Sequence, residues 1–119
     1  MKRFDPAPYL PLTPAMFQVL VALADGEKHG YAIIKEVARR TGETVRLHTG
    51  TLYTALRRFV DDGLVEESAE RPDPALDDER RRYYRLTDRG RAVALAEANR
   101  LEETLAQARA KFAMKPRRS

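Results

Sequence analysis

Apolar residues recur at helical spacing over three segments in the first half of the chain. The first segment follows Thr13, a helix-capping residue, and Pro14, which favours the first turn of a helix. The second segment spans residues 30–40 and the third spans residues 49–62. Each one ends near a glycine, a common helix stop signal. The pattern therefore predicts three short helices with brief connections.

The hydrophobic period changes after residue 63. Residues 64–67 and 82–86 are short runs bounded by breakers, and the second is rich in tyrosine, so both predict β-strands. The polar stretch between them contains Pro72 and Pro74 and is too long for a tight turn. A β-hairpin that follows three helices is a wing. We therefore expect a mainly α-helical fold with a small β-hairpin, a winged helix-turn-helix domain over residues 13–86.

A long final helix is predicted over residues 87–113, with Thr87 and Asp88 at its start and a basic tail, residues 114–119, after its end. Small and apolar residues recur along it at alternating steps of four and three, the seam of a coiled coil. The seam consists of Ala94, Ala98, Leu101, Leu105, Ala108 and Phe112. Because the winged domain is already complete, we expect this C-terminal dimerisation helix to form a homodimer. Packing within a monomer is the alternative.

Residues 1–12 contain three prolines and are expected to form an N-terminal arm. No apolar run is long enough to cross a membrane, and cysteine is absent. A cytoplasmic protein is the expectation. The two histidines, His29 and His48, lack metal-ligand spacing and are interpreted as capping or phosphate-facing residues. The sequence shows no phosphate-binding glycine loop or nucleophile motif, so we expect no cofactor, no metal and no enzyme activity.

Charge is distributed in blocks, although the net charge is only +4. Residues 28–58 hold seven lysine and arginine residues against two glutamates, a net charge of +5. Residues 61–79 hold nine acidic residues against one arginine, a net charge of −8. Residues 80–91 hold six arginines against one aspartate, again +5. The two basic blocks predict a surface for a polyanion such as DNA.

The third predicted helix has an apolar face with Leu52, Leu56 and Phe59, and its opposite face is polar. An α-helix fits the major groove of DNA, where arginine can pair with guanine. An ordinary solvated face is the alternative interpretation. The candidate DNA-binding residues of the chain are Lys28, His29, Tyr31, Thr49, Thr51, Tyr53, Thr54, Arg57, Arg58, Arg80, Arg81 and Arg82.

Three segments in order resemble the PadR family of transcriptional regulators: HGYAIIKE at 29–36, GTLYTALRRF at 50–59 with DGLV after it, and RYYRLTDRG at 82–90. The resemblance covers about residues 12–91. It implies a homodimeric repressor that binds a palindromic operator and releases it when a small molecule binds. It also implies roles for six residues of the third helix. Thr49, Thr51 and Tyr53 would meet phosphates, and Thr54, Arg57 and Arg58 would face the groove.

A single helix after the wing resembles the shorter branch of that family, in which a small aromatic effector can lie between the two C-terminal helices. The resemblance implies an effector cavity at the dimer centre, lined by Met16, Phe17, Val93, Glu97 and Leu101. The alternative function is a winged-helix protein-interaction module that does not bind DNA and uses the acidic loop as its contact surface. Low affinity for duplex DNA at low salt would favour this alternative.

Overall fold

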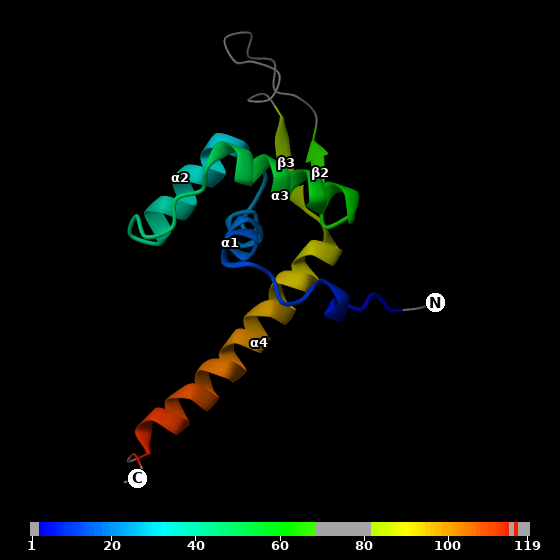
Figure 1. Ribbon diagram of the computed structural model, residues 1–119. Helices are drawn as coiled ribbons and strands as arrows, with labels where there is room; N and C mark the ends of the chain where they lie inside the picture. Colours follow the sequence, from blue (N-terminus) through cyan, green and yellow to red (C-terminus); the bar gives the residue numbers. More distant parts are fainter. Residues whose placement is uncertain (1–2, 69–81, 115, 117–119) are drawn as a thin grey trace.

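The computed structural model describes residues 3–68, 82–114 and 116 (Figure 1). Three helices, α1 (Pro14–Ala22), α2 (Gly30–Arg40) and α3 (Thr49–Asp61), pack against one another. A short 3-10 helix, η1 (Ala7–Tyr9), precedes them, and α4 (Asp88–Ala113) follows the sheet. The sheet consists of β1 (Lys28–His29), β2 (Val65–Ser68) and β3 (Tyr83–Leu86). The predicted helices and hairpin strands are therefore confirmed.

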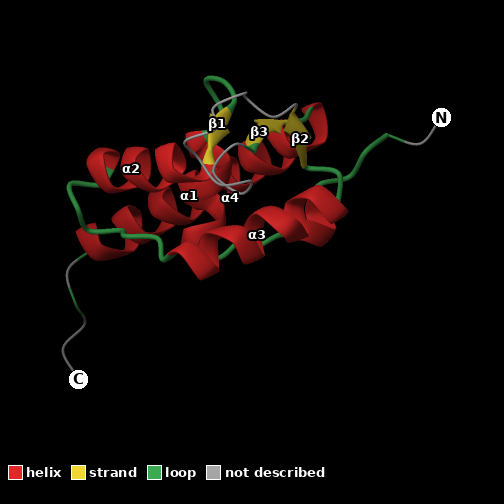
Figure 2. Ribbon diagram, turned by 90° about the horizontal axis from the view of Figure 1, so that it is seen from above, coloured by secondary structure: helices red, strands yellow, loops and turns green. Residues whose placement is uncertain are grey.

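The core lies where α1, α2 and α3 meet, and the first turns of α4 cover it. Its largest fully buried side chains come from each of these helices and from the turn before β2, among them Leu20, Ile33, Phe59, Leu64 and Val93. Burial of a large apolar side chain contributes about 1.5–3 kcal/mol, so this cluster is the main source of stability for the domain. It also fixes the orientation of α3, which lies along one edge of the molecule (Figure 2).

Three helices are capped by their own N-cap side chains. The Thr13 hydroxyl accepts from the Met16 N–H at 3.1 Å at the start of α1, and His29 Nδ1 accepts from the Ala32 N–H at 3.1 Å at the start of α2. Thr87 Oγ1 accepts from the Gly90 N–H at 3.0 Å at the start of α4. Such caps satisfy amides that have no partner inside the helix. They explain why these helices begin where the sequence predicts.

The sheet has three antiparallel strands in the order β1-β3-β2. The hairpin of β2 and β3 is the predicted wing, with Val65 opposite Leu86 and Ser68 opposite Tyr83. β1 was not predicted, because a strand of two residues is too short to show a period. It pairs His29 with Tyr83 and so ties the base of the wing to the start of α2.

The first half of α4 packs on the domain, and the second half projects away from it (Figure 1). Gly90, Val93 and Glu97 are buried. Beyond them the helix is largely exposed, although it carries large apolar side chains: Leu101 is 40% exposed, Leu105 52% and Phe112 89%. No helix in the described part of the chain is long and apolar enough to span a membrane.

Residues 3–12 lie against α4. The Leu12 N–H donates to Glu97 Oε2 at 2.6 Å. The guanidinium of Arg89 lies over the Phe4 ring at 5.2 Å, and Phe4 packs on Tyr9 with ring centroids 5.8 Å apart. The apolar side chains among the prolines explain this placement, since they gain burial by folding back.

Candidate nucleic-acid interface

Helix α3 presents one polar face to solvent. Leu52, Leu56 and Phe59 are buried as predicted, and Ala55 joins them. The exposed residues of the helix are Thr49, Gly50, Thr51, Thr54, Arg57, Arg58 and Asp61. At 100° per residue, Thr54, Arg57 and Asp61 lie opposite the core, while Thr51 and Arg58 lie on the flank toward α1. The outermost strip therefore combines a hydroxyl, a cation and a carboxylate.

Tyr53 is half-buried, because its ring lies over the start of α2. A Cβ atom at Gly30 would lie 2.4 Å from the Tyr53 hydroxyl oxygen, so only glycine allows this approach. The contact brings the N-terminal ends of α2 and α3 close together. Helix N-termini attract phosphate groups through their free N–H groups. The arrangement therefore suits one stretch of a phosphate backbone.

Lys28 and Tyr31 differ in how free they are to reach a ligand. The Lys28 ammonium pairs with Asp25 and lies 3.5 Å from Glu36 Oε1, and its side chain is mostly covered. Its hydrogen bond holds the pKa of the Asp25 carboxyl below its usual range. Tyr31 is 56% exposed, and the Lys35 ammonium lies over its ring at 4.8 Å. Lys28 is thus engaged within the protein, while Tyr31 and Lys35 face outward.

The wing adds one described arginine to this surface. Arg82 is exposed at the start of β3, with Nη1 3.8 Å from Glu67 Oε1. It borders a hollow of about 210 Å³ between α3 and the wing, together with Arg57, Asp61 and Glu67. Arg80, Arg81 and the acidic loop lie outside the described residues.

The residues expected to line an effector cavity at the dimer centre differ in how deeply they are buried in the protomer. Val93 and Glu97 are buried inside the protomer, with Glu97 1% exposed. Glu97 accepts from the Leu12 N–H and pairs with Arg100, and the Arg100 hydrogen bond lowers the pKa of the Glu97 carboxyl. Met16 and Phe17 are half-buried, and Leu101 is exposed. The helical spacing of Glu97 gave no sign of its bond to residue 12, because that partner is 85 residues away.

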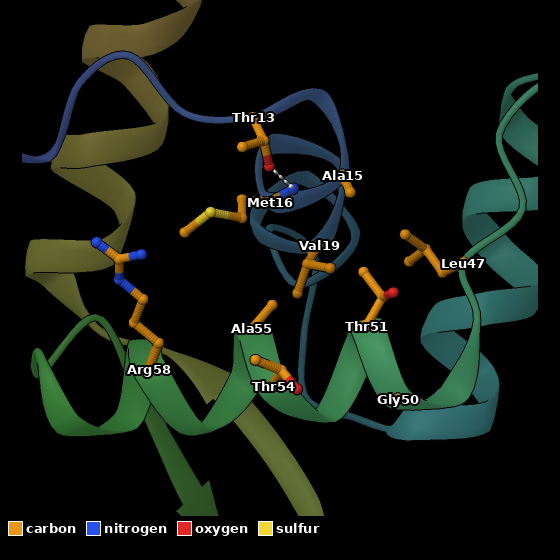
Figure 3. A pocket seen from close by; sticks show the side chains of 10 residues that line it. All are labelled: Thr13, Ala15, Met16, Val19, Leu47, Gly50, Thr51, Thr54, Ala55 and Arg58. Carbon is orange, nitrogen blue, oxygen red and sulfur yellow. Dashed lines mark hydrogen bonds between the residues drawn. The ribbon is translucent and has the colours of Figure 1, made fainter.

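The structure also contains a cavity that the sequence did not suggest. It has a volume of about 480 Å³ and lies between α1 and the flank of α3 (Figure 3). The residues that line it are Thr13, Ala15, Met16, Val19, Leu47, Gly50, Thr51, Thr54, Ala55 and Arg58. Three of the candidate DNA-binding residues therefore border a pocket as well as the outer surface.

A trihelical unit, an exposed polar third helix and a β-hairpin at its side define a winged helix-turn-helix domain of the DNA-binding class. The sequence pattern of the transcriptional regulator PadR-like family matches residues 19–96. The chain belongs to this family, whose members are transcription regulators and not enzymes.

Relatives and solved structures agree with this assignment. The transcriptional regulator Rv3488 of Mycobacterium tuberculosis is 40% identical over 85 residues, which cover 71% of this chain and 73% of that protein. A transcriptional regulator from Clostridium thermocellum has a similar structure, with a TM-score of 0.68 and 26% identity over 83% of this chain and 92% of that one. Bacillus subtilis PadR in complex with operator DNA shares the fold, with a TM-score of 0.61 and 21% identity over 71% of this chain and 47% of that one.

Proposed function

We propose that the protein is a homodimeric, sequence-specific DNA-binding repressor that acts in the cytoplasm. The observation that carries this proposal is α3, which the core holds in place through Leu52, Leu56 and Phe59 while Thr54 and Arg57 face solvent. A helix with this division can enter the major groove and present its polar side to base edges. The solved complex of Bacillus subtilis PadR, which shares the fold, contains operator DNA.

We divide the proposed contacts between base edges and phosphates by their position on the surface. Thr54 and Arg57 are assigned to base edges, because they lie on the exposed strip of α3 opposite the core. Thr49, Tyr31 and Arg82 are exposed and are assigned to phosphates, and so are Arg80 and Arg81, which lie outside the described residues. Lys28 is left out of both groups, since Asp25 and Glu36 neutralise its charge.

Dimerisation is proposed through the exposed part of α4. Leu101, Leu105 and Phe112 form an apolar strip that solvent covers in the protomer. Two copies of such a strip bury each other about a two-fold axis, which presents two α3 helices to a palindromic operator. The half-sites are then expected about one helical turn of DNA apart.

Release of the operator by a small aromatic effector remains part of the proposal. In the protomer Val93 and Glu97 are covered, so an effector at the dimer centre would contact Met16, Phe17 and Leu101 instead. A ligand releases DNA only if it binds the free dimer more tightly than the DNA-bound dimer.

The test is selection of duplexes from random sequence by the full-length protein, followed by salt titration of the recovered site. We expect a palindrome, and the logarithm of the binding constant should fall by about 0.9 per neutralised phosphate against the logarithm of salt concentration. Recovery of unrelated sequences with weak binding even at low salt would reject the proposal and favour a protein-interaction module.

A further inference from the structure

The cavity between α1 and α3 is built from two kinds of surface. Its apolar lining is aliphatic, from Ala15, Met16 and Val19 on α1, Leu47 before α3, and Ala55 on α3. No aromatic ring is present among the described residues that line it. A flat ring therefore has no partner to stack on, whereas a flexible hydrocarbon chain can fill the space by contacts with methyl groups.

The polar part of the cavity lies along α3. Thr51 and Thr54 border it, and Arg58 extends beside Met16 at one end (Figure 3). Arg58 is the one charged residue in the described lining. Within residues 3–68, 82–114 and 116, its guanidinium makes no hydrogen bond or ion pair. Its donors are thus available to an anion, and a carboxylate matches them in two-point geometry.

We propose that this cavity binds a medium-chain aliphatic carboxylate, with its tail against Met16, Val19 and Leu47 and its head group on Arg58. The bound acid engages Arg58 and covers Thr51 and Thr54. All three are candidate DNA-binding residues, and Thr54 is assigned to base edges. The acid and the operator therefore exclude each other. This regulatory step rests on the proposed function, whereas the binding site does not.

The cavity does not include the exposed strip of α4 that is proposed as the dimer interface. Leu101, Leu105 and Phe112 lie on α4 and do not line the cavity. All of its lining residues come from one chain, so we expect one binding site per chain.

The first experiment is calorimetric titration of the full-length protein, without DNA, with decanoate below its critical micelle concentration. Decanol serves as the control, because it has the same chain without the charge. We expect one decanoate per chain and binding of decanol at least about tenfold weaker, as for loss of a hydrogen bond to a charged group. Equal affinity for decanol overturns the role of Arg58. Tighter binding of cinnamate, an aromatic acid, overturns the aliphatic class.

A substitution that fills the cavity provides the second experiment. Ala15 is half-buried on the cavity wall, so Ala15→Phe places a ring in the space for the tail. Ala24→Phe is the matched control, because Ala24 is exposed and does not line the cavity. Decanoate binding should fall at least about tenfold in the first variant and stay unchanged in the second. Unchanged binding in both variants overturns the site.

If Ala15→Phe does not fold, the NMR signals of methyl groups in the unsubstituted protein test the site instead. Titration with decanoate should shift the methyl signals of Met16, Val19 and Leu47 and leave those of Leu105 in place. The reverse pattern places the ligand on the dimer helix and overturns the site.

The last experiment measures competition between decanoate and DNA. Decanoate should raise the dissociation constant for a selected duplex in the unsubstituted protein and not in Ala15→Phe. Binding of decanoate without any change in DNA affinity overturns the regulatory step. A protein that binds decanoate at Arg58 but no DNA rejects the proposed function and supports the site.

Discussion

Glu97 is a buried carboxylate whose two partners come from different parts of the chain. The Leu12 N–H donates to it at 2.6 Å, and Arg100 on the next turn of α4 pairs with it. A buried charge is tolerated only when it is paired and hydrogen-bonded, and both conditions hold here. Glu97 therefore joins the start of the domain to its last helix.

Removal of this carboxylate should destabilise the protein. Glu97→Ala leaves the Leu12 N–H without its acceptor, and the free energy of unfolding should fall by about 1–3 kcal/mol. Glu97→Gln keeps an acceptor and should lose less. Denaturant unfolding of both variants checks the order. Equal losses would mean that the contact to Leu12 contributes nothing.

The contribution of the Glu97 charge to the free energy of unfolding should depend on pH. Because the pKa of Glu97 is lowered in the folded protein, its stabilisation is complete above the unfolded-state pKa of about 4.3. It is then lost as the pH falls through the lower pKa of the folded state. The difference in unfolding free energy between the unsubstituted protein and Glu97→Gln should shrink below about pH 4. A difference that grows with acidity would contradict this direction.

Two arginines on the proposed DNA surface should behave differently. Arg57 lies on the outer strip of α3, so Arg57→Ala should change the preferred sequence and cost about 1–3 kcal/mol if it contacts a base by two hydrogen bonds. Arg82 lies on the wing, and Arg82→Ala should weaken binding to all sequences about equally and lower the salt slope. Selection and salt titration of each variant separate the two roles.

At the scale of elements, α4 approaches the turn before β2 very closely at Gly90. A Cβ atom there would lie 2.0 Å from the Leu64 carbonyl oxygen and 2.7 Å from Leu86 Cδ1. Thr87 strengthens the same junction, because its hydroxyl lies 2.7 Å from the Gly63 carbonyl oxygen and donates to it. The junction thus fixes the start of α4 against both the third helix and the wing.

Gly90→Ala should therefore destabilise the protein by about 1–3 kcal/mol, although alanine favours a helix. The matched control is Gly50→Ala, because a Cβ atom at Gly50 meets nothing within 4 Å. That variant should be neutral or slightly more stable. Thermal unfolding compares the two, and equal melting temperatures would contradict the close approach at Gly90.

The elements could be predicted where their signals are local. Thr13 and Thr87 mark helix starts, and the alternation of buried and exposed positions on α3 followed from its period. β1 could not be predicted, since its two residues become a strand only by pairing with β3. The packing of residues 3–12 on α4 and the burial of Glu97 depend on contacts between residues that are far apart in the sequence. The helical period places Glu97 near the apolar seam, but it does not distinguish a residue buried inside the protomer from one buried at a dimer interface.

The molecule as a whole is elongated. Its radius of gyration is 17.4 Å, against about 13.5 Å for a compact chain of this length, and its extents are 67 × 43 × 22 Å. The projecting half of α4 accounts for this shape (Figure 1). A helix of this length with exposed leucine and phenylalanine is stable in water when a second copy covers it.

Charges placed in this strip should separate the copies. Leu101→Asp combined with Leu105→Asp puts unpaired carboxylates into the proposed interface, and sedimentation should show monomers with much weaker DNA binding. Leu95→Asp is the control, because Leu95 is 59% exposed and lies off the seam. A double variant that stays dimeric would place the interface on another element.

Residues 3–12 pack against α4 at the point where this helix begins to project from the domain. In the proposed dimer, the contact between Leu12 and Glu97 therefore helps to set the angle between each winged domain and the projecting half of α4. A small change of this angle changes the distance between the two α3 helices along the DNA. Substitutions around Leu12 and Glu97 should thus reset the spacing between half-sites without touching a residue that meets the bases.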